Sequence, residues 1–408
     1  MGRRTAKVFT SGFFLVFLLQ SFVLAGVVED RNERAWTVMV YLGADNSIAG
    51  SPHLCLNWYD PVVEGLEAVG SSQDLAILVL WDLNDYGDSK LYYVDEYGDY
   101  IEQEDDGAVI PTSGEVSMGD PRTLIDFGLW SMSNYPSRYT ALIMTDHGGS
   151  WRKSMLDDTN GGDSLTTPEL GEAISVLQPD ILAFDACTMA STEVVYEIRD
   201  YVDYYCGSEE VAMMTVLFNV TAPFDYEEPL TALKNDPSTS PKKLSMLFVE
   251  SYDPYSATDH ANQTFSAVDT SKMDDLEEAI NQLADLLLAD LDSFEYAISQ
   301  ARSDVREYEP APESGMDVYI YVDLYDLVDL IAYYAYNASV DDACQAVKTA
   351  IDNAVVASTC VEGDNSYGLT IFLPDTDYGW IFDDLLWRYR QTQFGIHSSW
   401  DEILDELF

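Results

Sequence analysis

Short apolar runs alternate with amphipathic stretches along the first part of the chain. The runs are almost wholly apolar, which is typical of strands buried on both faces of a parallel sheet. Between them, apolar residues recur at helical spacing. This alternation predicts an α/β fold. The expected strands are residues 36–42, 75–80, 141–144, 181–184 and 202–206, a hairpin is expected within 90–104, and helices are expected at 124–132, 167–177 and 190–201.

The later part of the chain is richer in helix. A last strand is expected at 368–374, where Pro374 ends it. No internal repeat and no long low-complexity linker separates the parts, so we expect one sheet domain at 26–270 and a helical portion with the final strand at 271–408. Two apolar helical faces support this: Leu276, Ile280, Leu283 and Leu287, then Leu324, Leu327 and Ile331.

Two of the expected strands end in reactive residues. The run at 141–144 leads into His147, and the run at 181–184 leads into Cys187. The helix between them is expected to begin with Thr167 as its N-cap and a proline at its first position. In a strand-helix-strand unit the strands lie parallel, and ligands bind at the edge where they end. We therefore expect the histidine and the cysteine at one edge of the sheet.

Cys187 and His147 together suit nucleophilic catalysis. A thiol becomes a good nucleophile when a helix N-terminus or a nearby histidine favours the thiolate. Cys187 is expected just before the helix at 190–201, whose dipole would favour the anion. Gly148 and Gly149 let the backbone turn so that an amide points at a substrate carbonyl. A single cysteine or histidine usually has a structural role. The prediction of catalysis therefore rests on the expected closeness of Cys187 and His147.

The composition is typical of a globular protein, and the net charge disfavours some classes of binding partner. The 408 residues are 47% hydrophobic, and 72 acidic residues face 20 basic ones, for a formal charge of -52. Such a charge repels nucleic acid and anionic membranes. It suits a solvated surface in high salt or outside the cell, with cation binding as the alternative.

The amino terminus has the pattern of a secretory signal peptide. Arg3 and Arg4 precede an apolar run at 8–25 that ends in the small residue Ala25. This predicts a signal peptide at residues 1–25, with an uncleaved anchor as the alternative. No other apolar stretch approaches the roughly 18 residues that span a bilayer. We therefore expect an exported protein without a membrane span.

Five cysteines remain for an oxidising compartment. Cys344 and Cys360 lie close in sequence and are expected to form a disulfide. Cys55 and Cys206 are the other two that could pair, without a spacing that supports the bond. Cys187 is expected to stay a thiol.

The order of these motifs resembles the clostripain family of cysteine peptidases, relatives of caspases, legumains and gingipains. The resemblance rests on His147-Gly148 after one strand and Asp185-Ala186-Cys187 after the next. It implies a caspase-like three-layer sandwich with a mostly parallel sheet and an appended helical C-terminal portion. It also implies a secreted endopeptidase that cleaves after Arg or Lys. Supporting stretches lie at 36–42, 157–160, 165–170, 207–210 and 368–374.

The resemblance implies roles for individual residues. Cys187 would attack the scissile carbonyl to form an acyl-enzyme, and His147 would protonate the leaving amine and then activate water. The amides of Gly148 and Cys187 would hold the oxyanion. Asp185 lies on the same strand face as the cysteine and would pair with a basic substrate side chain, or alternatively would cap the next helix. Protein or peptide substrates are the expected partners, and the chemistry requires no cofactor.

Two further features lie between the two reactive residues. Asp157, Asp158 and Asp163 place oxygen ligands in a glycine-containing turn. Calcium binding in the family makes calcium a candidate cofactor, although the spacing is not that of an EF-hand and a solvated turn is the alternative. Arg152 and Lys153 offer a basic bond for self-processing, with a permanent surface loop as the alternative.

Two other function classes stay open. One is a binding or adhesion module outside the cell that kept the scaffold, which the presence of both His147 and Cys187 disfavours. The other is a thiol hydrolase that acts on a non-peptide ester or amide. Labelling with a peptidyl electrophile that carries arginine would separate these from a peptidase.

Overall fold

The computed structural model describes residues 34–49, 59–212, 215–216, 220–255, 263–308, 320–375 and 380–408. Glu33–Phe408 cluster as one compact unit. The expected signal peptide at 1–25 and Cys55 lie outside the described residues. None of the described helices combines the length and the apolar character that crossing a bilayer requires.

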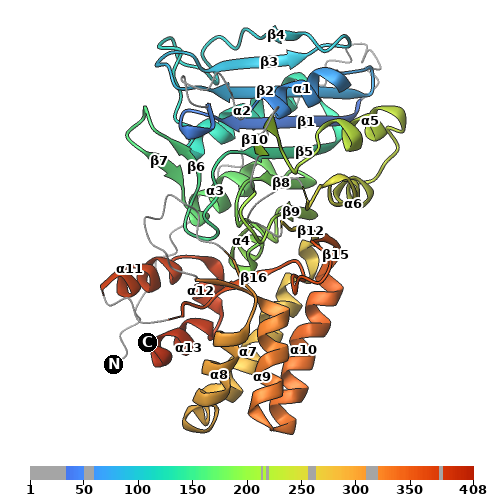
Figure 1. Ribbon diagram of the computed structural model, residues 1–408. Coiled ribbons are helices and arrows are strands. Elements are labelled where there is room, and N and C mark those ends of the chain that lie inside the picture. Colours follow the sequence, from blue (N-terminus) through green and yellow to red (C-terminus); the bar gives the residue numbers. More distant parts are fainter. Residues whose placement is uncertain are drawn as a thin grey trace, which may run out of the picture. The chain divides into compact units, whose positions relative to one another are not determined.

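A nine-stranded sheet forms the centre of this unit (Figure 1). In order across the sheet, the strands are β15 (Val355–Thr359), β12 (Phe265–Asp269), β9 (Tyr204–Gly207), β8 (Ile181–Asp185), β5 (Ser137–Thr145), β1 (Arg34–Gly43), β2 (Leu75–Asp82), β3 (Lys90–Val94) and β4 (Tyr100–Glu102). From β9 to β2 the neighbours pair parallel. Antiparallel strands complete both edges. The ends of the parallel strands therefore share one edge, where ligands bind in such sheets.

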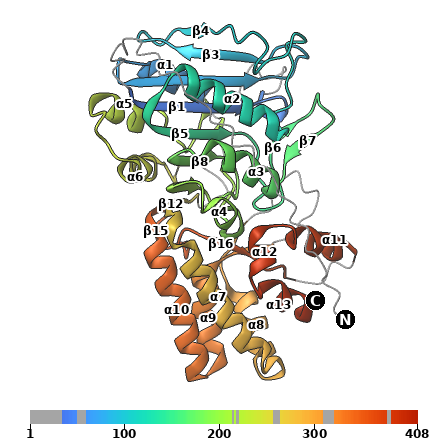
Figure 2. The same ribbon diagram turned by 180° about the vertical axis from the view of Figure 1, so that it is seen from behind.

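Alternate residues of the central strands enter two separate hydrophobic cores. In β1, Val38 and Val40 belong to one core, and Met39 and Tyr41 belong to the other. Side chains alternate along a strand, so each face needs its own cover. The first face is covered by helices α1 (Asp60–Val69), α5 (Glu227–Asn235) and α6 (Pro241–Ser251), and the second by α2 (Pro121–Asn134), α3 (Thr167–Leu177) and α4 (Thr192–Ile198) (Figure 2). These layers make a three-layer sandwich.

The later part of the chain adds four helices that pack against one another, and the last of them also contacts strands β12 and β15 (Figure 1). These helices are α7 (Met273–Leu288), α8 (Leu291–Asp304), α9 (Leu324–Ala335) and α10 (Ala338–Ala354). A three-stranded sheet of β13 (Glu307–Tyr308), β14 (Tyr321–Asp323) and β16 (Thr370–Phe372) leads to α11 (Trp380–Tyr389), α12 (Gln393–His397) and α13 (Trp400–Leu407). Two small hairpins are β6 (Ser154–Asp157) with β7 (Asp163–Leu165), and β10 (Thr215–Val216) with β11 (Val220–Thr221).

A buried carboxylate joins α4 to this later part. Glu193 Oε1 accepts hydrogen bonds from the Phe372 amide at 2.9 Å and from the Tyr389 hydroxyl at 3.1 Å. Burial raises the pKa of Glu193, so these donors offset part of the cost of placing the group in the core. Polar contacts therefore supplement apolar packing between α4 and the later part.

The predicted α/β class, with a mostly parallel sheet and helices at the C-terminal end, is confirmed. The five expected strands are present as β1, β2, β5, β8 and β9, and the expected hairpin is β3 with β4. Helix α3 is capped by Thr166 rather than by Thr167, in a capping box with Glu169. The helix expected at 190–201 is the shorter α4, Thr192–Ile198. The sequence did not distinguish the N-cap because two threonines, Thr166 and Thr167, precede the proline.

The expected disulfide between Cys344 and Cys360 is wrong, because no disulfide joins the cysteines of the described segments. Cys344 lies on the core-facing side of α10 and is buried among apolar side chains. Cys360 follows β15, where its sulfur lies 3.8 Å from the carbonyl oxygen of Ser366. Closeness in sequence did not place the two sulfurs on facing surfaces, which a disulfide requires.

Candidate active site

The predicted histidine and cysteine follow neighbouring parallel strands. β5 and β8 pair in register from Ala141 opposite Ile181 to Thr145 opposite Asp185. Along the chain, His147 follows Thr145 by the same number of residues as Cys187 follows Asp185. The register therefore places both loops at one edge of the sheet.

The two loops meet at Gly148. A β-carbon on Gly148 would overlap the carbonyl oxygen of Cys187 and would lie 2.9 Å from Cγ of Met189. A β-carbon on Gly149 would come no closer than 3.2 Å, to Cγ of the flexible Lys153 side chain. Only glycine permits the approach at position 148. Gly148 therefore sets the distance between the segments that carry His147 and Cys187.

The ring of His147 contacts a residue that the sequence analysis did not single out. Ser47 Oγ lies 2.9 Å from Nε2 of His147. Ser47 opens the 3-10 turn η1 (Ser47–Ala49) shortly after β1. The two residues are 100 positions apart in sequence, and they meet because β1 pairs with β5. This contact orients the imidazole ring of His147 through Nε2.

Asn46 and Asp146 brace the backbone around this histidine. Asn46 Nδ2 donates to Oδ1 of Asp146 at 2.8 Å and to the carbonyl of Leu156 at 2.7 Å. The same carboxylate oxygen accepts the amide of His147. The turn after β1, the end of β5 and the hairpin β6–β7 are therefore tied together beside the ring.

Backbone hydrogen bonds hold the loop that carries Cys187. The Thr188 amide donates to the Glu210 carbonyl at 3.1 Å, and the Ala190 amide donates to the Ser208 carbonyl at 2.8 Å. Thr188 adopts the left-handed conformation with φ of 55°. The expectation that Cys187 directly precedes a helix is wrong, because α4 begins only at Thr192. A fixed turn therefore positions the thiol, and the helix N-terminus that was expected to favour the thiolate does not directly follow Cys187.

Asp185 is buried behind the cysteine. Its Oδ2 accepts a hydrogen bond from the Tyr226 hydroxyl at 2.9 Å, and that hydroxyl lies 2.5 Å from Oγ1 of Thr145. Burial raises the pKa of Asp185 to about 7, although the Tyr226 hydrogen bond opposes the rise. The alternative that Asp185 caps the following helix is wrong, because the N-cap of α4 is Ser191. Sequence analysis missed Tyr226, whose distant position carries no local signal.

Comparisons with known proteins agree with this arrangement. A profile of the clostripain family matches residues 40–406. The chain belongs to the clostripain family. It is also 27% identical to clostripain from Hathewaya histolytica, over 86% of this chain and 76% of that protein. Clostripain-family membership makes the chain a cysteine peptidase, as the resemblance implied.

Solved structures share the fold of this clostripain-family chain. One is a secreted C11 cysteine protease from Bacteroides thetaiotaomicron in complex with an irreversible peptide inhibitor, with a TM-score of 0.64 and 21% identity, covering 90% of this chain and 99% of that one. Another is an inactive zymogen C11 protease from Parabacteroides distasonis, with a TM-score of 0.65 and 18% identity, covering 90% of this chain and 98% of that one. At these identities the likeness concerns the fold.

The expected grouping of Asp157, Asp158 and Asp163 is not present in this clostripain-family chain. Asp158 and Asp163 are exposed, and Asp163 accepts a hydrogen bond from Ser117. Asp157 is buried instead, since it ends β6 and turns toward the main sheet. Its carboxylate belongs to a cluster with Asp45 and Asp82, in which one oxygen of each lies within 4.8 Å of the others.

Burial affects the charge of this cluster. Burial raises the pKa of Asp82 to about 8 against the opposing hydrogen bond from Ser89, and the neighbouring carboxylates Glu115 and Asp157 add to the rise. Burial likewise raises the pKa of Asp157. Amide groups donate to these carboxylates as well: the Met118 amide to Asp157 at 2.8 Å and the Thr159 amide to Asp45 at 3.0 Å. Sequence analysis found Asp157 but not its partners, because they come from the ends of other strands.

Arg152 and Lys153 lie in a closed turn rather than an open loop. The Gly149 amide donates to the Lys153 carbonyl at 2.9 Å, and Nε of Arg152 donates to the Tyr321 hydroxyl at 2.7 Å. The segment after them forms the hairpin β6–β7. A peptidase would have to open this turn before it could cleave there.

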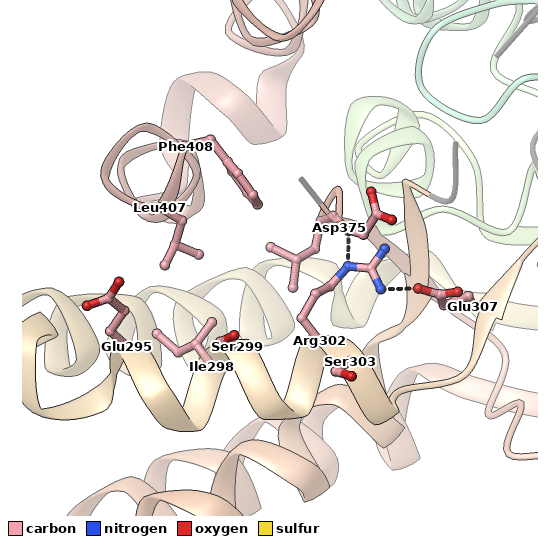
Figure 3. Close-up of a pocket in the computed structure, with 10 residues that line it drawn as sticks. Glu295, Ile298, Ser299, Arg302, Ser303, Glu307, Asp375, Leu407 and Phe408 are labelled. Atoms are coloured by element: carbon pink, nitrogen blue, oxygen red, sulfur yellow. Dashed lines mark hydrogen bonds and ion pairs between the residues drawn. The ribbon is translucent and has the colours of Figure 1, made fainter. Parts of the chain in front are cut away.

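A separate cavity of about 410 Å³ lies against α8 and the end of the chain (Figure 3). Ile298, Leu407 and Phe408 line it, and Arg302 reaches along its wall. Arg302 Nε donates to the Leu373 carbonyl at 2.7 Å, and its guanidinium pairs with Glu307. Its lining contains no cysteine or histidine. Arg302 thus bonds within the protein, and the cavity lacks the cysteine and histidine pair of the candidate site.

The contact at Gly148 predicts different effects for two adjacent substitutions. Gly148→Ala should lower kcat/KM for an arginyl amide by about a hundredfold or more, since the added methyl group forces the Cys187 loop away from His147. Gly149→Ala is the matched control and should retain activity within about threefold, since a lysine side chain can yield. Circular dichroism and thermal denaturation check that both variants fold. Equal activities in the two folded variants would contradict the assigned spacing role of Gly148.

Proposed function

We propose that the chain is a secreted endopeptidase that cleaves after Arg or Lys through Cys187 and His147. The observation that carries the proposal is the shared register of β5 and β8, which ends at Thr145 and Asp185 and brings both loops to one edge. The close approach of Gly148 to the Cys187 carbonyl supports it. An apolar amino-terminal run and a secreted relative support export.

The chemistry divides between the two residues. The Cys187 thiolate attacks the scissile carbonyl, and the resulting tetrahedral oxyanion takes hydrogen bonds from the amides of Gly148 and Cys187. His147 protonates the leaving amine, which departs and leaves a thioester on Cys187. His147 then takes a proton from water as that water attacks the thioester. Ser47, which contacts Nε2, helps to orient the ring for these proton transfers.

Asp185 supplies the preference for a basic residue. It is buried beside the nucleophile, and its carboxylate forms no ion pair with a basic residue of the described segments. A guanidinium or ammonium group of the substrate would provide the missing countercharge in a charge-assisted hydrogen bond. Tyr226 and Thr145 keep the carboxylate in place for that contact.

Replacement of the proposed nucleophile tests the function. Cys187→Ala should lower the cleavage of an arginyl amide by about four orders of magnitude or more, and His147→Ala should be nearly as severe. Cys360→Ala, which changes another half-buried cysteine, should keep full activity. The measurement is steady-state hydrolysis of a fluorogenic amide by proteins with matched melting curves. If folded Cys187→Ala keeps most of the activity, the proposed function is wrong.

Asp185 predicts a pH-dependent preference. Its raised pKa keeps the free carboxyl protonated below about pH 7, and a neutral carboxyl does not pair with a guanidinium. The ratio of kcat/KM for an arginyl over a citrullinyl amide should therefore rise about tenfold from pH 6 to pH 8. Ionisation of Cys187 and His147 changes kcat/KM for both substrates alike, so its effect cancels in the ratio.

The matched variant for this pH effect is Asp185→Asn. It should reduce the ratio at pH 8 by about 10- to 100-fold and make it independent of pH. Burial raises the folded-state pKa of Asp185, so the wild type loses stability as pH rises from about 4 to about 7. The variant should therefore be at least as stable at pH 8. An unchanged ratio in the folded variant would remove Asp185 from the pocket.

Self-processing remains part of the proposal. Arg152 and Lys153 are the only basic residues between His147 and Cys187, so a basic-specific cut in that segment must fall there. The closed turn implies that cleavage follows a local opening. Wild-type protein should yield two fragments on a denaturing gel, whereas Cys187→Ala and Arg152→Gln/Lys153→Gln should stay intact. A fully active single chain would show that this cut is not the switch.

A further inference from the structure

The turn that follows His147 is held by a residue far away in the sequence. Tyr321 opens β14 in the later part of the chain, and its side chain is fully buried. Its hydroxyl donates to the carbonyl of Gly149 at 3.0 Å, across 172 positions of sequence. A second contact joins the same two parts, because the ring of Trp151 packs on Phe372 at a centroid distance of 5.1 Å. The later part of the chain therefore holds this turn from outside.

Arg152 sets the direction of the hydrogen bond from Tyr321. Nε of Arg152 donates to the Tyr321 hydroxyl oxygen at 2.7 Å, and a guanidinium nitrogen can donate but cannot accept. The hydroxyl proton is thereby left for the Gly149 carbonyl. That carbonyl also accepts the Arg152 amide at 3.3 Å, so it has one local donor and one distant donor. Arg152 thus orients the hydroxyl that anchors Gly149.

The backbone of this turn needs an anchor outside itself. Two glycines in succession, Gly148 and Gly149, have wide conformational freedom. Ser150 then adopts the left-handed conformation with φ of 56°, which residues other than glycine rarely adopt. The Gly149 amide donates to the Lys153 carbonyl at 2.9 Å, which closes the turn but does not tie it to other elements. The Tyr321 hydroxyl supplies that tie at the glycine end.

The position of the turn decides where the Gly148 amide points. A β-carbon on Gly148 would overlap the Cys187 carbonyl, so the backbone there lies directly against the loop of the nucleophile. Under the proposed function that amide donates to the oxyanion, and such donors act best when they are already in place as the charge develops. Rotation about the backbone bonds of Gly148 and Gly149 would turn the amide away. An anchor on the Gly149 carbonyl restricts this rotation.

We propose that Tyr321 is a positioning residue for catalysis, because its hydroxyl holds Gly149 and thereby keeps the Gly148 amide aimed at the oxyanion. The anchoring stands on the contacts of Tyr321 alone, whereas its effect on catalysis rests on the proposed peptidase function. A cut after Arg152 or Lys153 would leave Gly149 and Arg152 on one fragment, with both contacts to Tyr321 in place. The anchor therefore serves the processed chain as well as the intact one.

Hydrogen exchange followed by mass spectrometry tests the anchor without reference to catalysis. Tyr321→Phe removes the hydroxyl and keeps the buried ring. In the full-length Cys187→Ala chain, this change should speed amide exchange in peptides that cover residues 148–153 by about tenfold, since local opening of the turn becomes easier. Peptides from β1 and β2 in the same sample are the internal reference and should keep their rates.

A second variant tests the same anchor from the other side. Arg152→Gln removes the donor that orients the hydroxyl, at a half-buried position where the fold tolerates change. In the Cys187→Ala chain it should speed exchange at 148–153 by about threefold. Unchanged exchange in either folded variant overturns the proposal.

A matched control separates this anchor from other tyrosine hydroxyls that bond to the backbone. Tyr100→Phe removes a hydroxyl that donates to the carbonyl of Val63 at 3.2 Å, from the edge strand β4. It should leave exchange at 148–153 unchanged. Equal acceleration in Tyr100→Phe and Tyr321→Phe would overturn the proposal.

The effect on catalysis is tested in the active chain. Tyr321→Phe should lower kcat for an arginyl amide about tenfold and change KM by less than about twofold, because the oxyanion forms only on the way through the transition state. An arginyl aldehyde forms an adduct with Cys187 whose oxygen takes the same place, so its affinity should weaken about tenfold. Alkylation of Cys187 by iodoacetamide needs no oxyanion donor, and its rate should stay within about twofold.

These measurements separate a failure of the anchor from a failure of the proposed function. Faster exchange at 148–153 without any change in kcat or aldehyde affinity would overturn the role of Tyr321 in catalysis. Equal losses of kcat, aldehyde affinity and alkylation rate would indicate a general disturbance of Cys187 and would also overturn it. A wild-type chain whose Cys187 is alkylated but which cleaves no arginyl amide would instead contradict the proposed peptidase function.

Discussion

The register between β5 and β8 is the constraint on which the whole site depends. Because the strands end together at Thr145 and Asp185, their loops leave the sheet side by side, and Gly148 lies against the carbonyl of Cys187. A slip of one residue would turn every side chain of a strand to the opposite face. The two hydrophobic cores forbid such a slip, so the packing of the sheet also fixes the geometry of the site.

The acidic composition has different consequences at the surface and at this edge. Exposed carboxylates stay hydrated, but with a formal charge of -52 their mutual repulsion opposes the compact state. Buried ones such as Asp185 and Asp82 receive hydroxyl donors from Tyr226 and Ser89, which compensate only partly for lost water. Burial therefore raises the pKa of both carboxyl groups, to about 7 for Asp185 and about 8 for Asp82. The net charge alone does not reveal which acidic residues are buried.

Sequence patterns predicted the features that depend on residues close together in the chain. The apolar runs gave the central strands, and the two motifs that end β5 and β8 gave His147 and Cys187. Contacts that depend on how strands distant in sequence align leave no local pattern in the sequence. Ser47 meets His147 because β1 pairs with β5, and Asp82 meets Asp157 because β6 packs against β1, the neighbour of β2. Of the acids Asp157, Asp158 and Asp163, which lie close in sequence, only Asp157 belongs to the buried cluster.

The turn after β1 shows how these long-range contacts can act together. Its three consecutive residues contact different partners: Asp45 the acidic cluster, Asn46 the backbone of β6, and Ser47 the ring of His147. Successive side chains in a short turn cannot move independently, because each shares a peptide plane with the next. A displacement of Asp45 by unbalanced carboxylate repulsion would therefore shift Ser47 as well. The turn after β1 therefore couples the packing of the buried acidic cluster to the orientation of the histidine ring.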